Sequence, residues 1–209
     1  MLSIVVPCYN EEAMIALFIE AVDRVMFQHP QKIEYIFVND GSKDGTLDLL
    51  KKYHQARPTE IHYLSFSRNF GKEAALYAGL QHAKGDFVTV MDADLQDPPE
   101  LLPEMLALIE TKKIDCVGNR RENRKGEPII LTAFSLLFYR LINQFSDTKM
   151  VDGARDFRLM TRQMVDAILE ITEYNRFSKG IFSWVGFETE YLSYENRERV
   201  AGETSWSFL

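Results

Sequence analysis

The sequence predicts an α/β protein with a mostly parallel central sheet flanked by helices, because strand-like and helix-like segments alternate from its first residues. Two strand–loop–helix units occupy the first fifty residues. Such βαβ units have right-handed crossovers and build parallel sheets. A third observation is that polar residues follow several of the expected strands directly. Since ligands bind beyond the carboxyl ends of strands in open α/β sheets, the sequence also predicts a binding site at that edge.

The elements follow from local pattern. Apolar runs of four to eight residues predict strands, and apolar residues three or four apart predict helices. Strands are expected at 3–8, 33–39, 61–66, 86–91, 115–119, 157–159 and 187–194, the last near the sheet edge because its apolar and polar residues alternate. The first helix should bury Ile15, Leu17, Phe18, Ala21 and Val22, and further helices are expected from Thr46 and over 73–82, 101–111, 128–145 and 162–170.

Length and composition limit the possible classes of protein. At 209 residues and 46% hydrophobic, the chain can bury one good core, and we expect a single domain over residues 1–209. With 31 acidic against 24 basic residues, the net charge of −7 disfavours general nucleic-acid binding. Cys8 and Cys116 lie in apolar strands and are expected to be reduced, buried thiols.

Asp92 and Asp94 form an Asp-x-Asp pair directly after an apolar run at 87–90. Side chains two apart on an extended backbone face the same side, so both carboxylates can point to one site. Hard oxygen ligands of this kind suit Mg²⁺ or Mn²⁺ together with substrate phosphates. Pro98 and Pro99 then end the strand and begin a helix. The alternative is a solvated acidic turn, but Tyr9 and Asp40 also follow strands and strengthen the hypothesis of a metal–diphosphate site.

Five motifs carry a resemblance to a known family. They are VVPCYNEE (5–12), VNDGSKDGT (38–46), FSRNFGKEAAL (66–76), DADLQDPPE (92–100) and DGARDFRLM (152–160). This set resembles the polyprenyl-phosphate glycosyltransferases, the group that includes dolichol-phosphate mannose synthase and the bacterial bactoprenol glucosyltransferases. The resemblance covers about residues 2–206. It implies an inverting transferase with the GT-A fold, a Rossmann-like arrangement.

The resemblance also assigns roles to the donor-side residues. It implies that the nucleotide is held by Pro7, Tyr9, Glu11, Asp40, Lys72 and Asp92. The metal ion, Mg²⁺ or Mn²⁺, would be bound by Asp92, Asp94 and Gln96, with Asp94 counted among the catalytic residues. The metal would act as a Lewis acid for the leaving group.

Basic residues are expected on the phosphate and acceptor side. Arginine forks bind phosphates well, and Arg120, in a Gly-x-Arg-Arg run, and Arg158 are the best candidates. Near the end, Arg199 and Ser205 resemble part of a phosphate-clamping loop. Ser205 stands where many relatives have a lysine, which shifts the cationic role to Arg199. For any single residue the alternative is a solvated surface charge.

Asp156 is the candidate catalytic base. It resembles an acid that relatives present at the start of the helix facing the acceptor. Because a phosphate acceptor is already ionised, this acid could serve mainly in positioning and charge balance. The alternative is a structural salt bridge to Arg155 or Arg158.

The segment 128–145 is the most apolar of the expected helices, and a basic run at 120–125 precedes it. This pattern predicts an interfacial helix at the membrane surface. A dimerisation face in a homo-oligomer or an ordinary buried helix are the alternatives. The chain contains no apolar run of eighteen residues. Because it ends at Leu209 in mid-pattern, we expect a catalytic domain truncated before transmembrane helices, with a naturally short enzyme as the alternative.

Together these observations predict a metal-dependent inverting glycosyltransferase. It would move a hexose from a nucleotide sugar, with UDP-glucose or a relative favoured, to polyprenyl phosphate at the cytoplasmic face of the cell membrane. One rival is a transferase acting on a sugar hydroxyl of a glycan or protein, which would need a base of raised pKa. Another is a nucleotide-sugar-binding regulator without turnover. A nucleotidyltransferase is disfavoured, since residues 7–12 lack a glycine-rich basic loop.

Overall fold

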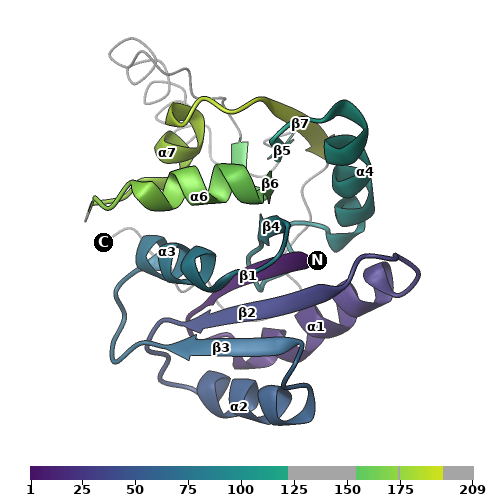
Figure 1. The fold of residues 1–209 in the computed structure, drawn as a ribbon. Helices are drawn as coiled ribbons and strands as arrows, with labels where there is room; N and C mark the ends of the chain where they lie inside the picture. The colour runs from purple at the N-terminus through teal and green to yellow at the C-terminus, as the bar shows by residue number, and fades with distance from the viewer. Residues whose placement is uncertain (122–153, 174, 195–209) are drawn as a thin grey trace, which may run out of the picture.

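A computed structural model describes residues 1–121, 154–173 and 175–194. Its seven-stranded sheet has the order β3-β2-β1-β4-β6-β5-β7 (Figure 1). The strands are β1 (Leu2–Cys8), β2 (Ile33–Asn39), β3 (Ile61–Ser65), β4 (Phe87–Val90), β5 (Cys116–Arg121), β6 (Ala154–Thr161) and β7 (Thr189–Tyr194). The helices are α1 (Glu12–Met26), α2 (Thr46–Ala56), α3 (Lys72–His82), the 3₁₀ turn η1 (Pro99–Leu101), α4 (Leu102–Lys112), α6 (Arg162–Glu170) and α7 (Ser178–Trp184).

The sheet is mostly parallel, as predicted. Strands β3, β2, β1 and β4 pair in parallel with one another in that order, and β7 pairs in parallel with β5. Only β6 runs antiparallel, to β4 on one side and β5 on the other. The antiparallel β6 carries residues from late in the chain back beside β4, where Asp92 and Asp94 begin their loop.

Helices cover both faces of the sheet, so the strands are buried on two sides (Figure 1). Helices α1, α2 and α4 pack on one face and α3, α6 and α7 on the other. Strand β1 shows how the strand residues divide between these layers: Leu2, Ile4 and Val6 join the α1 side, while Val5 joins the α3 side. This two-sided burial explains why the strands are continuous apolar runs.

The strand order reverses between β1 and β4. Strands β2 and β3 extend the sheet from one side of β1, whereas β4 pairs with its other side. At such a switch point the loops after neighbouring strands diverge to opposite faces and leave a crevice. The loops after β1 and β4, which hold the candidate site residues, therefore open at this crevice.

Three details differ from the sequence-based expectations. Leu17 is 39% exposed, and the buried face of α1 is formed by Met14, Ile15, Phe18, Ile19, Val22 and Met26. The strand expected at 157–159 extends over the whole of Ala154–Thr161, because it pairs on both sides. Helix α7 was not expected at all. The two cysteines are buried and unpaired, as predicted.

Three sequence-based predictions lie outside the described residues: the interfacial helix at 128–145, Arg199 and Ser205. Among the helices that the structure does describe, none combines the length and the apolar character needed to cross a bilayer.

Candidate functional site

A small cleft of about 60 Å³ opens at the carboxyl ends of β1 and β4. Pro7, Tyr9 and Glu11 come from β1 and the loop after it, and Asp92 and Asp94 come from the loop after β4. The first residue of helix α3, Lys72, completes the lining together with Ala93. All the predicted donor-side residues except Asp40 and Gln96 thus line one cleft, although they come from three segments of the chain.

Lys72 joins two carboxylates at this cleft. Its Nζ lies 2.7 Å and 2.9 Å from the two carboxylate oxygens of Asp92. The same nitrogen donates to Oδ2 of Asp156 at 2.8 Å. Asp92 and Asp156 follow Lys72 by 20 and 84 residues, so this contact depends on β6 lying beside β4. Lys72 therefore connects the predicted donor side to the predicted acceptor side.

The charges of this cluster stabilise one another. Burial alone would lower the pKa of Lys72, but the carboxylates of Asp92 and Asp156 outweigh burial and raise it. Burial alone would raise the pKa of Asp156, but Lys72, and after it Lys179, lower this pKa to about 2. At neutral pH Lys72 is therefore an ammonium ion and Asp156 a carboxylate.

Asp156 lies within a strand, and the expectation that it begins a helix is wrong. It is the third residue of β6, two positions before Arg158 and four before Met160, which packs on the α3 side of the sheet. Because side chains alternate along a strand, Asp156 faces that side too. Helix α3 starts there, which explains why Lys72 reaches Asp156. The expected alternative, a salt bridge to Arg155 or Arg158, is not among the ion pairs of the described residues.

Asp40 is placed next to the cleft rather than in it. The carboxylate is 1% exposed, and its two oxygens accept hydrogen bonds from the backbone N–H groups of Phe70 (2.6 Å) and Gly71 (2.9 Å). Gly41 has a φ of +65° and fits tightly, since a Cβ there would lie 2.3 Å from the backbone carbon of Arg68. In this structure Asp40 holds the loop that leads into α3, so it positions Lys72.

The loops after β1 and β2 are also joined. The backbone N–H of Glu11 donates to the Thr46 hydroxyl at 2.9 Å, and that hydroxyl donates to Asp44 at 2.6 Å. The N–H of Lys43 donates to the Asn10 side chain at 2.8 Å. The first bond satisfies the backbone N–H of Glu11 at the start of α1, and together these bonds give the Tyr9–Glu11 segment of the cleft lining a defined shape.

The donor set suits a hard divalent cation that also binds substrate. Asp92 and Asp94 supply carboxylates at the open end of β4, while Oε1 of Gln96 is 3.5 Å from an Arg155 nitrogen. Within the described part of the chain, no three His, Cys, Asp or Glu side chains form a metal-binding group. Mg²⁺ and Mn²⁺ sites of this kind take few protein ligands and complete their shell with phosphate oxygens and water. The residues therefore fit Mg²⁺ or Mn²⁺ bound together with a diphosphate.

A second polar group beside the cleft was missed by sequence reasoning. Asp97 is 2% exposed, accepts a hydrogen bond from the Tyr194 hydroxyl, and lies 3.3 Å from the guanidinium of Arg155. Burial would lower the pKa of Arg155, but Asp97 in the main raises it, so the guanidinium of Arg155 is charged. The only available signal was the place of Asp97 in the motif DADLQDPPE (92–100). The bonds tie the loop after β4 to strands β6 and β7.

The two described arginines predicted to bind phosphate have different surroundings. Arg120 is exposed on β5, and its Nε donates to the Ser193 hydroxyl at 3.0 Å. Arg158 is 3% exposed; its guanidinium lies 3.9 Å from the centroid of the Phe182 ring and donates to the carbonyl of Arg155. Burial under α7 thus keeps Arg158 from the surface, while Arg120 stays available to solvent.

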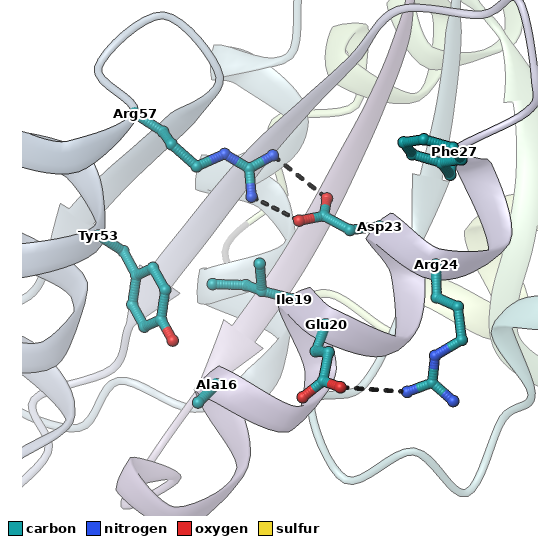
Figure 2. A pocket seen from close by; sticks show the side chains of 8 residues that line it. All are labelled: Ala16, Ile19, Glu20, Asp23, Arg24, Phe27, Tyr53 and Arg57. Atoms are coloured by element: carbon teal, nitrogen blue, oxygen red, sulfur yellow. Dashed lines mark hydrogen bonds and ion pairs between the residues drawn. The ribbon is translucent and has the colours of Figure 1, made fainter.

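A roomier hollow of about 600 Å³ lies elsewhere, between α1 and α2 (Figure 2). An ion pair of Asp23 with Arg57 and the 86% exposed Phe27 lie at its wall. It contains none of the residues singled out from sequence. Volume alone therefore does not identify the candidate site, whereas the convergence of polar residues at strand ends does.

Comparisons with known proteins agree with this geometry. Residues 3–169 match the model of "Glycosyl transferase family 2". A putative glycosyltransferase of Bacillus subtilis is 42% identical over 208 residues, which are 100% of this chain and 62% of the relative. The bactoprenol glucosyl transferase of Shigella phage SfV is 41% identical over 201 residues, 96% of this chain and 65% of the relative. The chain thus spans a little under two thirds of the length of these curated relatives.

Solved structures show the same fold at lower identity. A mannosyltransferase from Pyrobaculum calidifontis, in complex with GDP-Man and Mn²⁺, superposes with a TM-score of 0.61 at 18% identity, covering 92% of this chain and 54% of that one. Glucosyl-3-phosphoglycerate synthase from Mycobacterium tuberculosis, in complex with Mn²⁺, UDP and glucosyl-3-phosphoglycerate, superposes with a TM-score of 0.60 at 20% identity, covering 97% of this chain and 73% of that one. The fold is GT-A, as predicted, and the chain belongs to glycosyl transferase family 2.

Proposed function

We propose that this protein is an inverting hexosyltransferase that uses Mg²⁺ or Mn²⁺. It moves a hexose from a nucleotide sugar, with UDP-glucose or a close relative favoured, to polyprenyl phosphate at the cytoplasmic face of the membrane. The observation that carries the proposal is the Lys72 bridge between Asp92 and Asp156. Through this one lysine, Asp92, which in the proposal binds the metal ion and diphosphate, is linked to Asp156, which in the proposal acts on the acceptor side.

On the donor side, Tyr9 and Glu11 line the cleft from the loop after β1, and Asp92 and Asp94 line it from the loop after β4. In the proposal the first pair and Pro7 contact the nucleoside, and the carboxylates hold the diphosphate through the metal ion. The metal supplies Lewis acidity for the departing diphosphate. Asp40 contributes indirectly, because it holds the loop that precedes Lys72.

On the acceptor side, Asp156 favours an acceptor that is already ionised. With a pKa of about 2, its carboxylate is a weak proton acceptor at neutral pH. A sugar hydroxyl needs a stronger base than this, whereas a phosphate oxygen needs none. In the proposal Asp156 orients Lys72 and balances charge as the phosphate attacks the anomeric carbon opposite the diphosphate.

The name of the phage relative supports the same assignment, since that relative is called a bactoprenol glucosyl transferase and matches 96% of this chain. Because polyprenyl phosphate is a lipid, transfer of the sugar to it takes place at the membrane surface. The proposal therefore includes membrane association, with the segment at 128–145 as the predicted interfacial helix.

The test is transfer to lipid. The protein is mixed with UDP-glucose, UDP-galactose or GDP-mannose, with Mg²⁺ or Mn²⁺, and with undecaprenyl phosphate in detergent micelles, and the lipid product is identified by mass spectrometry. One hexosyl-phosphoryl lipid is expected, formed with a UDP-hexose and lost when EDTA removes the metal. Undecaprenol, which lacks the phosphate, is the matched control acceptor and should receive no sugar.

Two results would contradict the proposal. Transfer to a soluble glycan hydroxyl without lipid would identify the hydroxyl-directed rival. Tight binding of a nucleotide sugar with no transfer to any acceptor would identify the regulator.

A further inference from the structure

Helix α7 lies over the acceptor side of the candidate site. The ring of Phe182 on α7 stacks on the guanidinium of Arg158 on β6 at 3.9 Å. Asp156 and Arg158 share one face of the strand, and Lys179 and Phe182, three residues apart, share one face of the helix. The same packing therefore brings Lys179 to Asp156, and the ammonium of Lys179 is, after Lys72, the second charge that lowers the pKa of Asp156.

Helix α3 fixes the start of α7. The carboxylate of Glu73 accepts hydrogen bonds from the backbone N–H of Ser178 at 3.1 and 3.0 Å, and another from the Ser178 hydroxyl. Ser178 is 5% exposed, so this contact is shielded from water. Lys72 and Glu73 are adjacent, as are Ser178 and Lys179. One turn of α3 thus positions both lysines that act on Asp156.

Lys179 differs from the other cations around Asp156. Lys72 is shared between two carboxylates, Arg155 pairs with Asp97, and Arg158 is buried against Phe182. Within the described part of the chain, the ammonium of Lys179 forms no hydrogen bond and no ion pair. Its attraction to Asp156 acts through charge over a longer distance. Burial, and repulsion from the other three cations, lower its pKa despite Asp156. An anion entering here would gain a desolvated ammonium donor.

The location decides which anion this is. Lys179 lies on α7, which packs on β6 through the stack of Phe182 on Arg158, and the carboxylate that acts on it is that of Asp156. It therefore belongs to the Asp156 side of the cluster rather than to the metal and diphosphate side. We propose that Lys179 binds the phosphate group of the acceptor, and that the Glu73–Ser178 contact positions it for this role. This inference rests on the proposed function, since it assumes a phosphate acceptor.

The test compares Lys179→Gln with Lys179→Arg in the transfer assay. Lys179→Gln should raise the KM for undecaprenyl phosphate by about tenfold or more, the size of one lost charged contact. The KM for the nucleotide sugar and the melting temperature should stay unchanged. Lys179→Arg should restore much of the acceptor KM, because a guanidinium also binds phosphate. Lys51→Gln, at an exposed lysine on α2, is the matched control and should behave as the parent.

Ser178→Ala tests the positioning contact. It removes the hydroxyl donor to Glu73 but keeps the backbone N–H donor, so a few-fold rise in acceptor KM with unchanged donor KM is expected. Equilibrium binding of undecaprenyl phosphate in micelles gives a second readout that needs no turnover. An unchanged acceptor KM and unchanged lipid binding in Lys179→Gln would overturn the inference, as would a rise confined to the donor KM. A parent that neither binds nor glycosylates the lipid would instead overturn the proposed function.

Discussion

Two clusters in this molecule place one cation between two carboxylates, and they differ in where the fold puts them. Arg57 contacts Asp23 at 2.6 Å beside the hollow between α1 and α2 (Figure 2). It also contacts Glu60 at 2.6 Å. Lys72 contacts Asp92 at 2.7 Å and Asp156 at 2.8 Å at the carboxyl edge of the sheet. The chemistry of the two contacts is similar, but their partners and positions are not.

The side chains of the Arg57 cluster bind one another. Two guanidinium nitrogens bind both oxygens of Asp23, and the Tyr35 hydroxyl donates to the same carboxylate at 2.7 Å. Glu60 lies only three residues from Arg57 along the chain. Such a planar, bidentate contact braces α1 against the turn before β3. We assign this cluster a structural role, although its hollow is roomier than the candidate site.

The Lys72 cluster is assembled from α3, β6 and the loop after β4, at the point where the strand order reverses. A lysine ammonium is a compact charge on a flexible chain, so its contacts can be exchanged when another charged group enters. Position at the switch point of the sheet therefore distinguishes a binding site from a structural ion pair.

The largest effect is expected from Asp94→Ala, which removes a hard ligand at the open end of β4. Transfer of sugar to lipid should be abolished while the melting temperature stays close to that of the parent, because the side chain is not part of the core. Asp92→Ala should do nearly the same and also weaken nucleotide binding. Asp23→Ala, which removes a carboxylate from the Arg57 cluster, is the control and should retain transfer. Full transfer activity in Asp94→Ala or Asp92→Ala, together with transfer by the parent that continues in EDTA, would refute the metal site.

Asp156→Asn should have the second largest effect. It keeps the size of the side chain but removes the charge that holds Lys72, so kcat should fall within the range of about 10²–10⁴ seen for lost acid–base groups. The lower half of that range is expected, since a phosphate acceptor needs little basicity. Affinity for the donor, measured by calorimetry, should change little. A collapse of donor affinity would move Asp156 to the donor side or to a structural role.

The pH profile sharpens this prediction. Since the pKa of Asp156 is about 2, below its ordinary value near 4, its carboxylate stays charged at all pH values above about 3. Its contribution to stability is therefore present above pH 4 and is lost as the pH falls through 2. No acidic limb from Asp156 should appear in kcat between pH 5 and 8. A limb near pH 6 that disappears in Asp156→Asn would indicate a true general base and hence a hydroxyl acceptor.

The smallest effect is expected from Arg57→Gln. Arg57 and Asp23 are about a third exposed, so solvent screens the pair and its loss should cost roughly 0.2–1 kcal/mol of unfolding free energy. Urea denaturation measures this loss, and the transfer assay should show no change. Reduced transfer without reduced stability would mean that the α1–α2 hollow takes part in function and that the comparison fails.

The local sequence pattern predicted most of the described strands and helices. Strands β1 and β2 and helix α6 match their expected ranges closely. Apolar runs and helical periodicity are local features of the sequence and do not depend on how the elements pack. In α6, the Thr161 side chain also caps the helix by accepting from the N–H of Met164. No local pattern predicts helix α7, because it has only seven residues, includes Gly180 and lacks a side-chain cap. Its first turn is held instead by Glu73, more than a hundred residues away.

Which side chains follow the strands can be predicted from the sequence alone: Tyr9 after β1, Asp40 after β2, and Asp92 and Asp94 after β4. Strand ends can be read from local apolar runs, and parallel strands place their ends at one edge of a sheet. Only the folded chain brings Lys72 to both Asp92 and Asp156, turns Asp40 inward to the loop before α3, and brings Lys179 near enough to Asp156 to lower the pKa of that carboxyl. These contacts depend on the antiparallel insertion of β6 beside β4, a pairing between segments about seventy residues apart that no local pattern encodes.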